Sequence, residues 1–271
     1  MLAFAVRFCI LWTQEWDFCG YYMEDAMKHI SILMVLAFSM VLAGTGYADV
    51  RCQLGILTPE TLEGNNPATS EPWQVGDQYR LVFISSTFVD PQTNAANDIA
   101  YWNDAVQAIA NSATSHDLSS VSWKIIGSTS SVDARDNTST NPNVDGTGHA
   151  IFGMDGSSVI ENNYEDLWDG AAPQNKAWFD ENGVALADST AVNWPLTGTG
   201  WNGTRHSTAF LKDTSTSGNI RQGHPTAEDG RAWIDAGRVG ASWFSVQPSS
   251  VYGMSEPLSI QAPGATVIIL K

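Results

Sequence analysis

The chain has 271 residues, of which 13 are Lys or Arg and 29 are Asp or Glu, so its formal net charge is −16. This excess of acid argues against a nucleic-acid-binding protein, because phosphate neutralisation requires clustered basic residues. It also argues against binding to anionic membrane surfaces.

Residues 27–48 have the features of a secretory signal peptide. A short basic start, Met27-Lys28, precedes an apolar run from Ile30 to Leu42, and the segment ends in Gly46-Tyr47-Ala48. An apolar core of about a dozen residues is shorter than the roughly 20 that span a bilayer. We predict an extracellular or periplasmic protein that begins at Asp49 and has no membrane contact after cleavage. If the segment stays uncut, it is an N-terminal anchor.

This interpretation makes residues 1–26 an upstream start-codon artefact. The remaining 223 residues carry 11 basic and 25 acidic side chains, a net charge of −14. Cys52 is the one cysteine left, so the domain cannot be a disulfide scaffold despite its predicted export. Its place beside the new N-terminus predicts a mobile free thiol.

The predicted elements begin after an irregular, turn-rich segment at 49–76. Tyr79–Ser85 is β-rich and apolar on both faces, which predicts a central strand. Asn94–Ala113 is predicted to be a helix, because apolar residues recur there at steps of three and four. Val121–Gly127 is predicted to be a second, short strand.

Residues 128–230 are rich in Gly, Ser, Thr, Asn and Asp and show no sustained period. Large aromatic residues recur through this region, which favours long loops held by buried aromatics over disorder. Regular structure is predicted to return as strands at Val251–Glu256, Leu258–Ile260 and Thr266–Leu270. We expect one domain, 77–262, followed by a tail at 263–271.

An ordered series of motifs carries a family resemblance. Its pieces are Trp123–Thr129, Asp133–Asn137, Asp155-Gly156, Val159-Ile160, Tyr164–Gly170, Gly200–Thr204 and Ser250–Glu256. The series resembles a family of exported bacterial domains of uncharacterised function, found in planctomycete-type surface proteins. Those domains are distantly similar to the C-type-lectin-like and endostatin-like fold.

The resemblance implies an α+β fold with small antiparallel sheets, one main early helix, long irregular loops and paired terminal strands. The elements predicted above follow the same order. The chain departs from cysteine-bearing relatives of the fold, since it has no cysteine pair to join its strands or loops. The tripeptide Trp102-Asn103-Asp104 occurs in sugar-binding C-type lectins on a late strand, but here it falls on the early helix, so no sugar site is assigned to it.

The polar cluster Asp133-Ala134-Arg135-Asp136 allows two interpretations. Asp133 and Asp136 can bind a ligand or cation. Alternatively, the forked guanidinium of Arg135 is a structural tie to Asp166 or Asp169, which we favour because a loop-built domain without disulfides needs such ties.

Metal ligands and catalytic residues are not predicted at any position. The turns Asp145-Gly146, Asp155-Gly156 and Asn162-Asn163 offer oxygen ligands suited to calcium, but none follows a defined calcium loop. Calcium is therefore a possible cofactor without an assigned site.

Trp194 and Trp201, flanked by Gly, Thr and Pro, are the tryptophans that we expect to be exposed. With Asn202, Asp133 and Asp136 they form the predicted ligand-binding set, since an exposed aromatic face can stack on a sugar ring. We predict a binding or surface-interaction module for a carbohydrate or protein ligand. The alternative is a secreted hydrolase that cleaves polysaccharide with two carboxylates.

Overall fold

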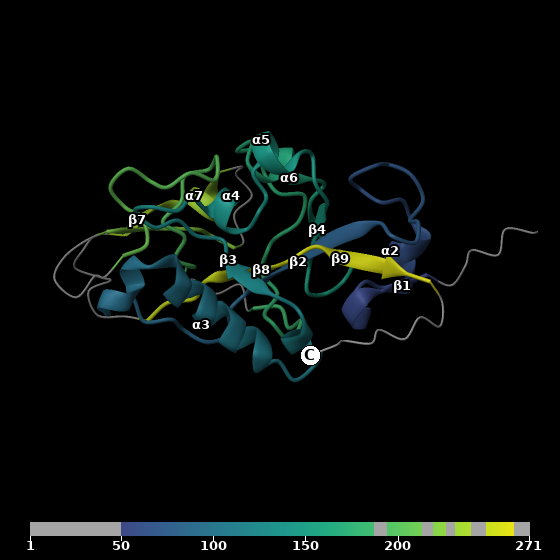
Figure 1. Cartoon of the computed structure of the whole chain (residues 1–271), viewed down its shortest axis with the longest axis horizontal. Helices are drawn as coiled ribbons and strands as arrows, with labels where there is room; N and C mark the ends of the chain where they lie inside the picture. Colours follow the sequence, from purple (N-terminus) through teal and green to yellow (C-terminus); the bar gives the residue numbers. More distant parts are fainter. Residues whose placement is uncertain (1–49, 187–193, 213–218, 226–230, 240–247, 263–271) are drawn as a thin grey trace, which may run out of the picture. The chain divides into compact units, whose positions relative to one another are not determined.

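The fold is built around strand β2 (Gln78–Ile84), in which every residue after Gln78 is buried. A computed structural model describes residues 50–186, 194–212, 219–225, 231–239 and 248–262, which belong to one unit, 49–271 (Figure 1). The described part is a mixed α+β structure with a mostly open sheet. Val, Ile, Leu and aromatic residues favour such a strand when both of its faces are covered.

Strand β2 has neighbours from distant parts of the chain. The sheet order is β1 (Arg51–Cys52), β9 (Leu258–Gln261), β2, β4 (Ala150–Gly153) and β5 (Val159–Glu161), and β8 (Tyr252–Ser255) pairs with β2 and with β3 (Trp123–Ile125). Both β8 and β9 run antiparallel to β2. The expected pairing of the terminal strands, Tyr79–Ser85 with the strands between Val251 and Ile260, is thus confirmed.

The prediction of small, antiparallel sheets is wrong for this part of the structure. One sheet contains seven strands, and β2 pairs with β4 in parallel, with Tyr79 opposite Ala150 and Val82 opposite Gly153. Strand β4 has four residues, all buried, so it is too short to show a period in the sequence. The specific lectin-like topology stays a prediction.

Helix α3 (Ile99–Asn111) covers one face of the sheet (Figure 1). It is shorter than predicted, because Asp98 has an extended backbone and its carboxylate accepts a bond from Ala100 N at 3.0 Å. This cap separates α3 from the short helix η2 (Asn94–Asn97). Trp102, fully buried, packs with Phe83 and Trp123 in the core on this face.

The opposite face of the sheet is covered by short helices and loops. These are α4 (Ala134–Asn137), α5 (Pro142–Asp145), α6 (Tyr164–Leu167) and α7 (Ala232–Asp235), beside a two-stranded sheet of β6 (Ile220–Gln222) and β7 (Gly237–Val239). Val82 and Ile84 of β2 pack here against Tyr164, Leu167 and Trp233. The predicted loop region is therefore held by buried aromatics, but it also contains the strands β4, β5 and β6.

The N-terminal segment is more regular than predicted. Strand β1 pairs with β9, the 3-10 helix η1 spans Gln53–Gly55, and helix α2 spans Pro59–Glu63 with Thr58 as its N-cap. A further 3-10 helix, η3, spans Leu118–Ser120. The prediction of a mobile thiol is wrong, because Cys52 is buried and its Sγ donates to Leu57 O at 3.7 Å. Pairing with β9 places it in the core.

The predicted strand Thr266–Leu270 and the segment 27–48 lie outside the described residues. Among the residues that are described, no helix has the length and apolar character needed to cross a bilayer.

Candidate functional site

The turn Gly200–Thr204 is the centre of the predicted ligand-binding residues. Gly203 N donates to Gly200 O at 3.0 Å, and Thr199 and Arg205 pair across the turn. The Asn202 side-chain oxygen accepts from the backbone N and the hydroxyl of Thr204, at 3.2 and 2.7 Å. This local bond is the usual way in which an asparagine stabilises a turn, and it leaves the Asn202 amide nitrogen available as a donor.

Two bonds join this turn to the Asp133–Asp136 cluster. Asp133 Oδ1 accepts from Arg205 N at 2.9 Å, and Arg135 N donates to Gly203 O at 3.2 Å. Residues that are some 70 positions apart in the sequence therefore meet at one place. The structure brings together Asp133, Arg135, Trp201 and Asn202 from the predicted set.

Trp201 is exposed, as predicted. Its exposed fraction is 36%, whereas Trp102, Trp123 and Trp233 are almost fully buried. The indole lies against Gly170, where an added Cβ would come within 2.8 Å of Cε3, and the Arg231 guanidinium lies over the ring at 5.1 Å. This cation–π contact holds a solvent-exposed cation in place.

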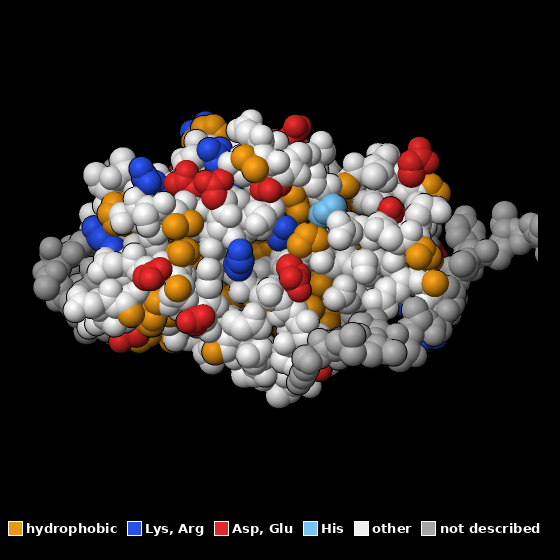
Figure 2. All heavy atoms as spheres, viewed as in Figure 1, with side chains coloured by type: hydrophobic (Ala, Val, Ile, Leu, Met, Phe, Trp, Pro, Cys, Tyr) orange, Lys and Arg blue, Asp and Glu red, His pale blue; other side chains and the backbone are white. Residues whose placement is uncertain are grey.

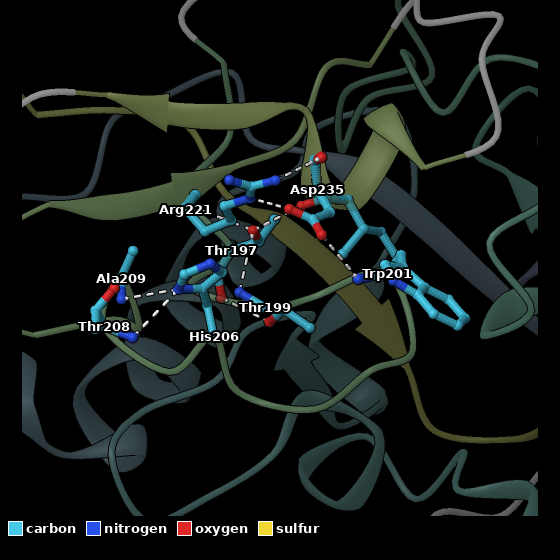
Figure 3. Close-up of polar contacts among 9 residues, drawn as sticks. Thr197, Thr199, Trp201, His206, Thr208, Ala209, Arg221 and Asp235 are labelled. Atoms are coloured by element: carbon cyan, nitrogen blue, oxygen red, sulfur yellow. Dashed lines mark hydrogen bonds and ion pairs between the residues drawn. The ribbon is translucent and has the colours of Figure 1, made fainter.

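The polar contacts beneath Trp201 fix its backbone. Trp201 N donates to Asp235 Oδ2 at 3.2 Å, and the Arg221 guanidinium forms an ion pair with Asp235. Thr197 donates from its hydroxyl to Ile234 O at 2.8 Å, which ties the same segment to α7. Figure 3 shows the indole pointing away from the polar side chains around Asp235. The ring is thus held from below and presented outward.

We call Arg135, Trp201, Asn202, Arg205 and Arg231 the Trp201 surface. Arg205 and Arg231 are exposed, and no carboxylate among the described residues lies within ion-pair distance of any of the three arginines. Figure 2 shows Lys and Arg side chains together with Asp and Glu side chains over α4 and α7. The Trp201 surface therefore offers three guanidinium groups within a region of mixed charge.

The predicted structural tie of Arg135 is not formed within the described residues. Its side chain is only half-buried, and its buried Nε has no hydrogen-bond partner in the described part of the chain. Asp166 accepts from the Asn162 side chain at 2.8 Å, and Asp169 accepts from Ala171 N at 2.5 Å. The two acids stabilise their own loop instead.

Three predicted ligand-binding residues are not part of the Trp201 surface, and one of them, Asp133, is bonded to it through Arg205 N. Asp136 accepts from the Asn141 side chain at 2.6 Å, an internal contact of the loop that follows α4. Trp194 is 37% exposed, as predicted, and its ring lies 4.7 Å from that of His224.

The three turns considered for calcium carry structural bonds. Asp155 accepts from Ser157 and Ser158, Asn163 caps α6, and Asp145 accepts from Asn141 N at 2.8 Å. The residues that the structure describes hold no group of three His, Cys, Asp or Glu side chains placed to bind a metal. Calcium binding stays a prediction from the sequence.

A cavity of about 530 Å³ lies on the loop-covered face, and no sequence motif predicted it. Its charged and titratable lining residues are Arg80, Lys124, Asp145, His149, Tyr164 and Glu256. In Figure 2, Lys or Arg and Asp or Glu side chains lie over β3 and β8, and a His side chain lies beside them near β4. The one sequence signal was an arginine inside the apolar run Tyr79–Ser85, where a charge is unexpected.

Burial changes the protonation of two groups in this cavity. The pKa of His149 is lowered from its ordinary value by burial and by the nearby Arg80 cation, so the imidazole is neutral at pH 7. The pKa of Tyr164 is raised by burial, although Arg80 opposes the shift, so the phenol keeps its proton.

Glu161, at the end of β5, is the most perturbed carboxyl that the structure describes. Its exposed fraction is 3%, and burial, with the charges of Asp166 and Asp169, raises its pKa to about 9. Its Oε1 is buried without a partner in the described residues. Glu161 does not line the cavity, so it is a protonated core residue and not a catalytic acid for that cavity.

The chain matches no protein-family model, and no curated protein shows significant similarity to it.

Proposed function

We propose that the protein is an exported binding module that recognises an acidic glycan at the Trp201 surface. The observation that carries this proposal is an exposed tryptophan with an arginine stacked on its ring and two more arginines at the same turn. The α+β domain below the surface supplies a rigid support for these side chains.

The charges favour an oxyanion on the ligand. Guanidinium groups bind carboxylate and sulfate through paired hydrogen bonds, and Arg135, Arg205 and Arg231 have no carboxylate partner among the described residues. Of the carboxylates bonded to this turn, Asp235 is neutralised by Arg221, and Asp133 accepts from Arg205 N and keeps its charge. A ligand carboxylate would therefore meet three guanidinium groups against the one remaining charge of Asp133.

The exposed indole favours a sugar ring. An acidic sugar carries an oxyanion and apolar C–H groups on one ring, so its apolar part can contact the exposed part of the indole while its oxyanion binds the neighbouring arginines. A nucleic acid fits less well, because three arginines cannot neutralise a long phosphate backbone and the net charge of residues 49–271 is −14. Cleavage of the glycan would need two carboxylates facing the scissile bond, and Asp133 and Asp235 are held by the bonds described above.

The proposal is tested with residues 49–271 and a series of oligosaccharides. Isothermal titration should show binding of oligogalacturonate and none of a neutral oligosaccharide of equal length. Trp201→Ala and Arg135→Ala should each weaken binding at least about tenfold, the scale of a lost charge-assisted bond. Phe88→Ala, which removes another exposed aromatic ring, is the matched control and should leave the affinity unchanged.

Further ligands separate the remaining interpretations. A sulfated glycan that binds as well as oligogalacturonate shows that any oxyanion on a sugar ring suffices. Equal binding of polyglutamate would point to an acidic protein ligand instead. Release of shortened oligosaccharides would show that the protein is a hydrolase.

A further inference from the structure

The cavity at Arg80 lies on the face of β2 that also carries Val82 and Ile84, because strand residues alternate between faces. Its lining comes from β2, β3, the α5 end, α6 and the β8–β9 connection. A volume of about 530 Å³ falls within the range of small-molecule sites, roughly 300–1,000 Å³. These separate segments together form a concave polar site.

Arg80 is a buried cation without a carboxylate partner in the described part of the chain. It is 3% exposed, and its guanidinium donates to three neutral acceptors: Tyr164 Oη at 2.6 Å, Ser255 O at 2.7 Å and Ser139 O at 3.1 Å. Burying a charge is unfavourable unless an opposite charge compensates it. A guanidinium has five N–H donors, so two remain for a ligand after these three bonds.

The other donors of the cavity are compatible with an anion. Tyr164 Oη accepts from Arg80, so its own hydrogen is directed elsewhere, and neutral His149 has one N–H to donate. Lys124 on β3 is exposed and adds a second positive charge to the lining. Donors from four segments of the chain thus meet in one cavity.

The same cavity also contains two acceptors. Asp145 accepts from Asn141 N through Oδ2, and Glu256 accepts from Ser122 N through Oε1. In each carboxylate the second oxygen makes no hydrogen bond within the described residues. These oxygens can accept from hydroxyl or ammonium groups. A simple inorganic anion has no such groups and would leave both carboxylate oxygens without a donor.

We propose that this cavity binds a small carboxylate that also carries hydroxyl or ammonium groups, with its carboxylate on Arg80 and Lys124. The hydroxyl or ammonium groups bind Asp145 and Glu256. This site is separate from the Trp201 surface: it is a half-open cavity with room for one small molecule, and it shares no residue with that surface.

The experiment uses residues 49–271 and three probes followed by protein chemical shifts: D-glucuronate, L-serine and D-glucose. Glucuronate and serine share a carboxylate, but glucuronate carries only hydroxyl groups beside it, whereas serine carries an ammonium group and one hydroxyl. We expect at least one of them to bind and D-glucose to bind at least about tenfold more weakly, because it lacks the charge. Binding of glucose equal to that of both carboxylates would overturn the proposal.

Two variants test whether the probe binds in the cavity at Arg80. Lys124→Ala should weaken binding about tenfold, and Ser122→Trp should abolish it by filling the cavity mouth. Lys212→Ala removes a lysine that lies over Phe210 outside the cavity, and should have no effect. Arg80→Lys can also be measured, but its result counts only if the variant unfolds at the same point as the unmodified protein. The test therefore uses the exposed positions Lys124 and Ser122. The proposal fails if neither carboxylate binds. It also fails if binding survives both Lys124→Ala and Ser122→Trp. Loss of binding only in Trp201→Ala would place the carboxylate at the Trp201 surface instead.

Discussion

The Arg80 guanidinium donates to the Tyr164 hydroxyl at 2.6 Å, a buried bond between residues 84 positions apart. It connects the central strand to the first residue of α6. Both side chains also line the cavity, so a contact that supports the fold orients a candidate ligand-binding group.

Tyr164→Phe should lower the free energy of unfolding by about 1–3 kcal/mol, because it leaves a buried, charged donor of Arg80 without its acceptor. Urea unfolding measures this change. Tyr101→Phe is the control: its hydroxyl donates to Asp90 O at 2.6 Å at an exposed position, and its loss should cost less than about 1 kcal/mol. Equal effects of the two substitutions would show that the buried Arg80–Tyr164 bond contributes no more to the free energy of unfolding than an exposed bond.

Glu161 should make the protein less stable as the pH rises. Its pKa in the folded state, about 9, lies above its ordinary value of 4.5, so the folded protein retains a proton that the unfolded chain releases. The stabilisation is complete below pH 4.5 and is lost as the pH rises through 9. The loss is about 1 kcal/mol per pH unit within this window.

Glu161→Gln should therefore flatten the dependence of unfolding free energy on pH between 5 and 9, and should raise the stability at pH 8. Urea unfolding at a series of pH values tests this. Glu165→Gln, at an exposed position on α6, should leave the slope unchanged. A slope that persists in Glu161→Gln would assign the effect to another group.

Gly203→Ala should destabilise the protein by about 2–4 kcal/mol, because two costs add. The residue has φ = 77°, and an added Cβ would lie 2.7 Å from the Trp168 ring. Gly55→Ala has a similar φ of 66° but no atom within 4 Å of the added Cβ, so only backbone strain, about 1 kcal/mol, should lower its stability. Thermal unfolding of both variants compares them, and an equal loss would mean that the Trp168 contact is readily relieved.

Protein recovered from the native host should begin at Asp49. Intact mass and N-terminal sequencing measure this directly. Peptides from residues 1–26 would disprove the upstream-start interpretation, and retention of 27–48 would indicate an anchored protein.

The sequence predicted the elements whose signal is local. Tyr79–Ser85 is long enough to show a strand composition, and the glycine-rich flanks of Trp201 indicated an exposed ring. Strand β4 was not predictable because its four buried residues have no period of their own, and they form a strand only because β2 offers a free edge.

The same distinction between local and long-range signals applies to the candidate sites. Asp133 and Arg135 were singled out because they are neighbours in the sequence, and the structure places both at the Gly200–Thr204 turn. The favoured partner of Arg135 was wrong because a guanidinium can reach many acids, and sequence distance does not choose among them. Arg80 and Tyr164 were missed because nothing local relates positions 84 residues apart.

The antiparallel partners of β2 are β8 and β9, which lie far from it in the sequence: Leu81 N donates to Ser255 Oγ across 174 positions. During synthesis the central strand therefore cannot pair on that side until these distant strands have been made. Contacts of such long sequence separation slow folding. We therefore expect this side of the sheet to form late in folding.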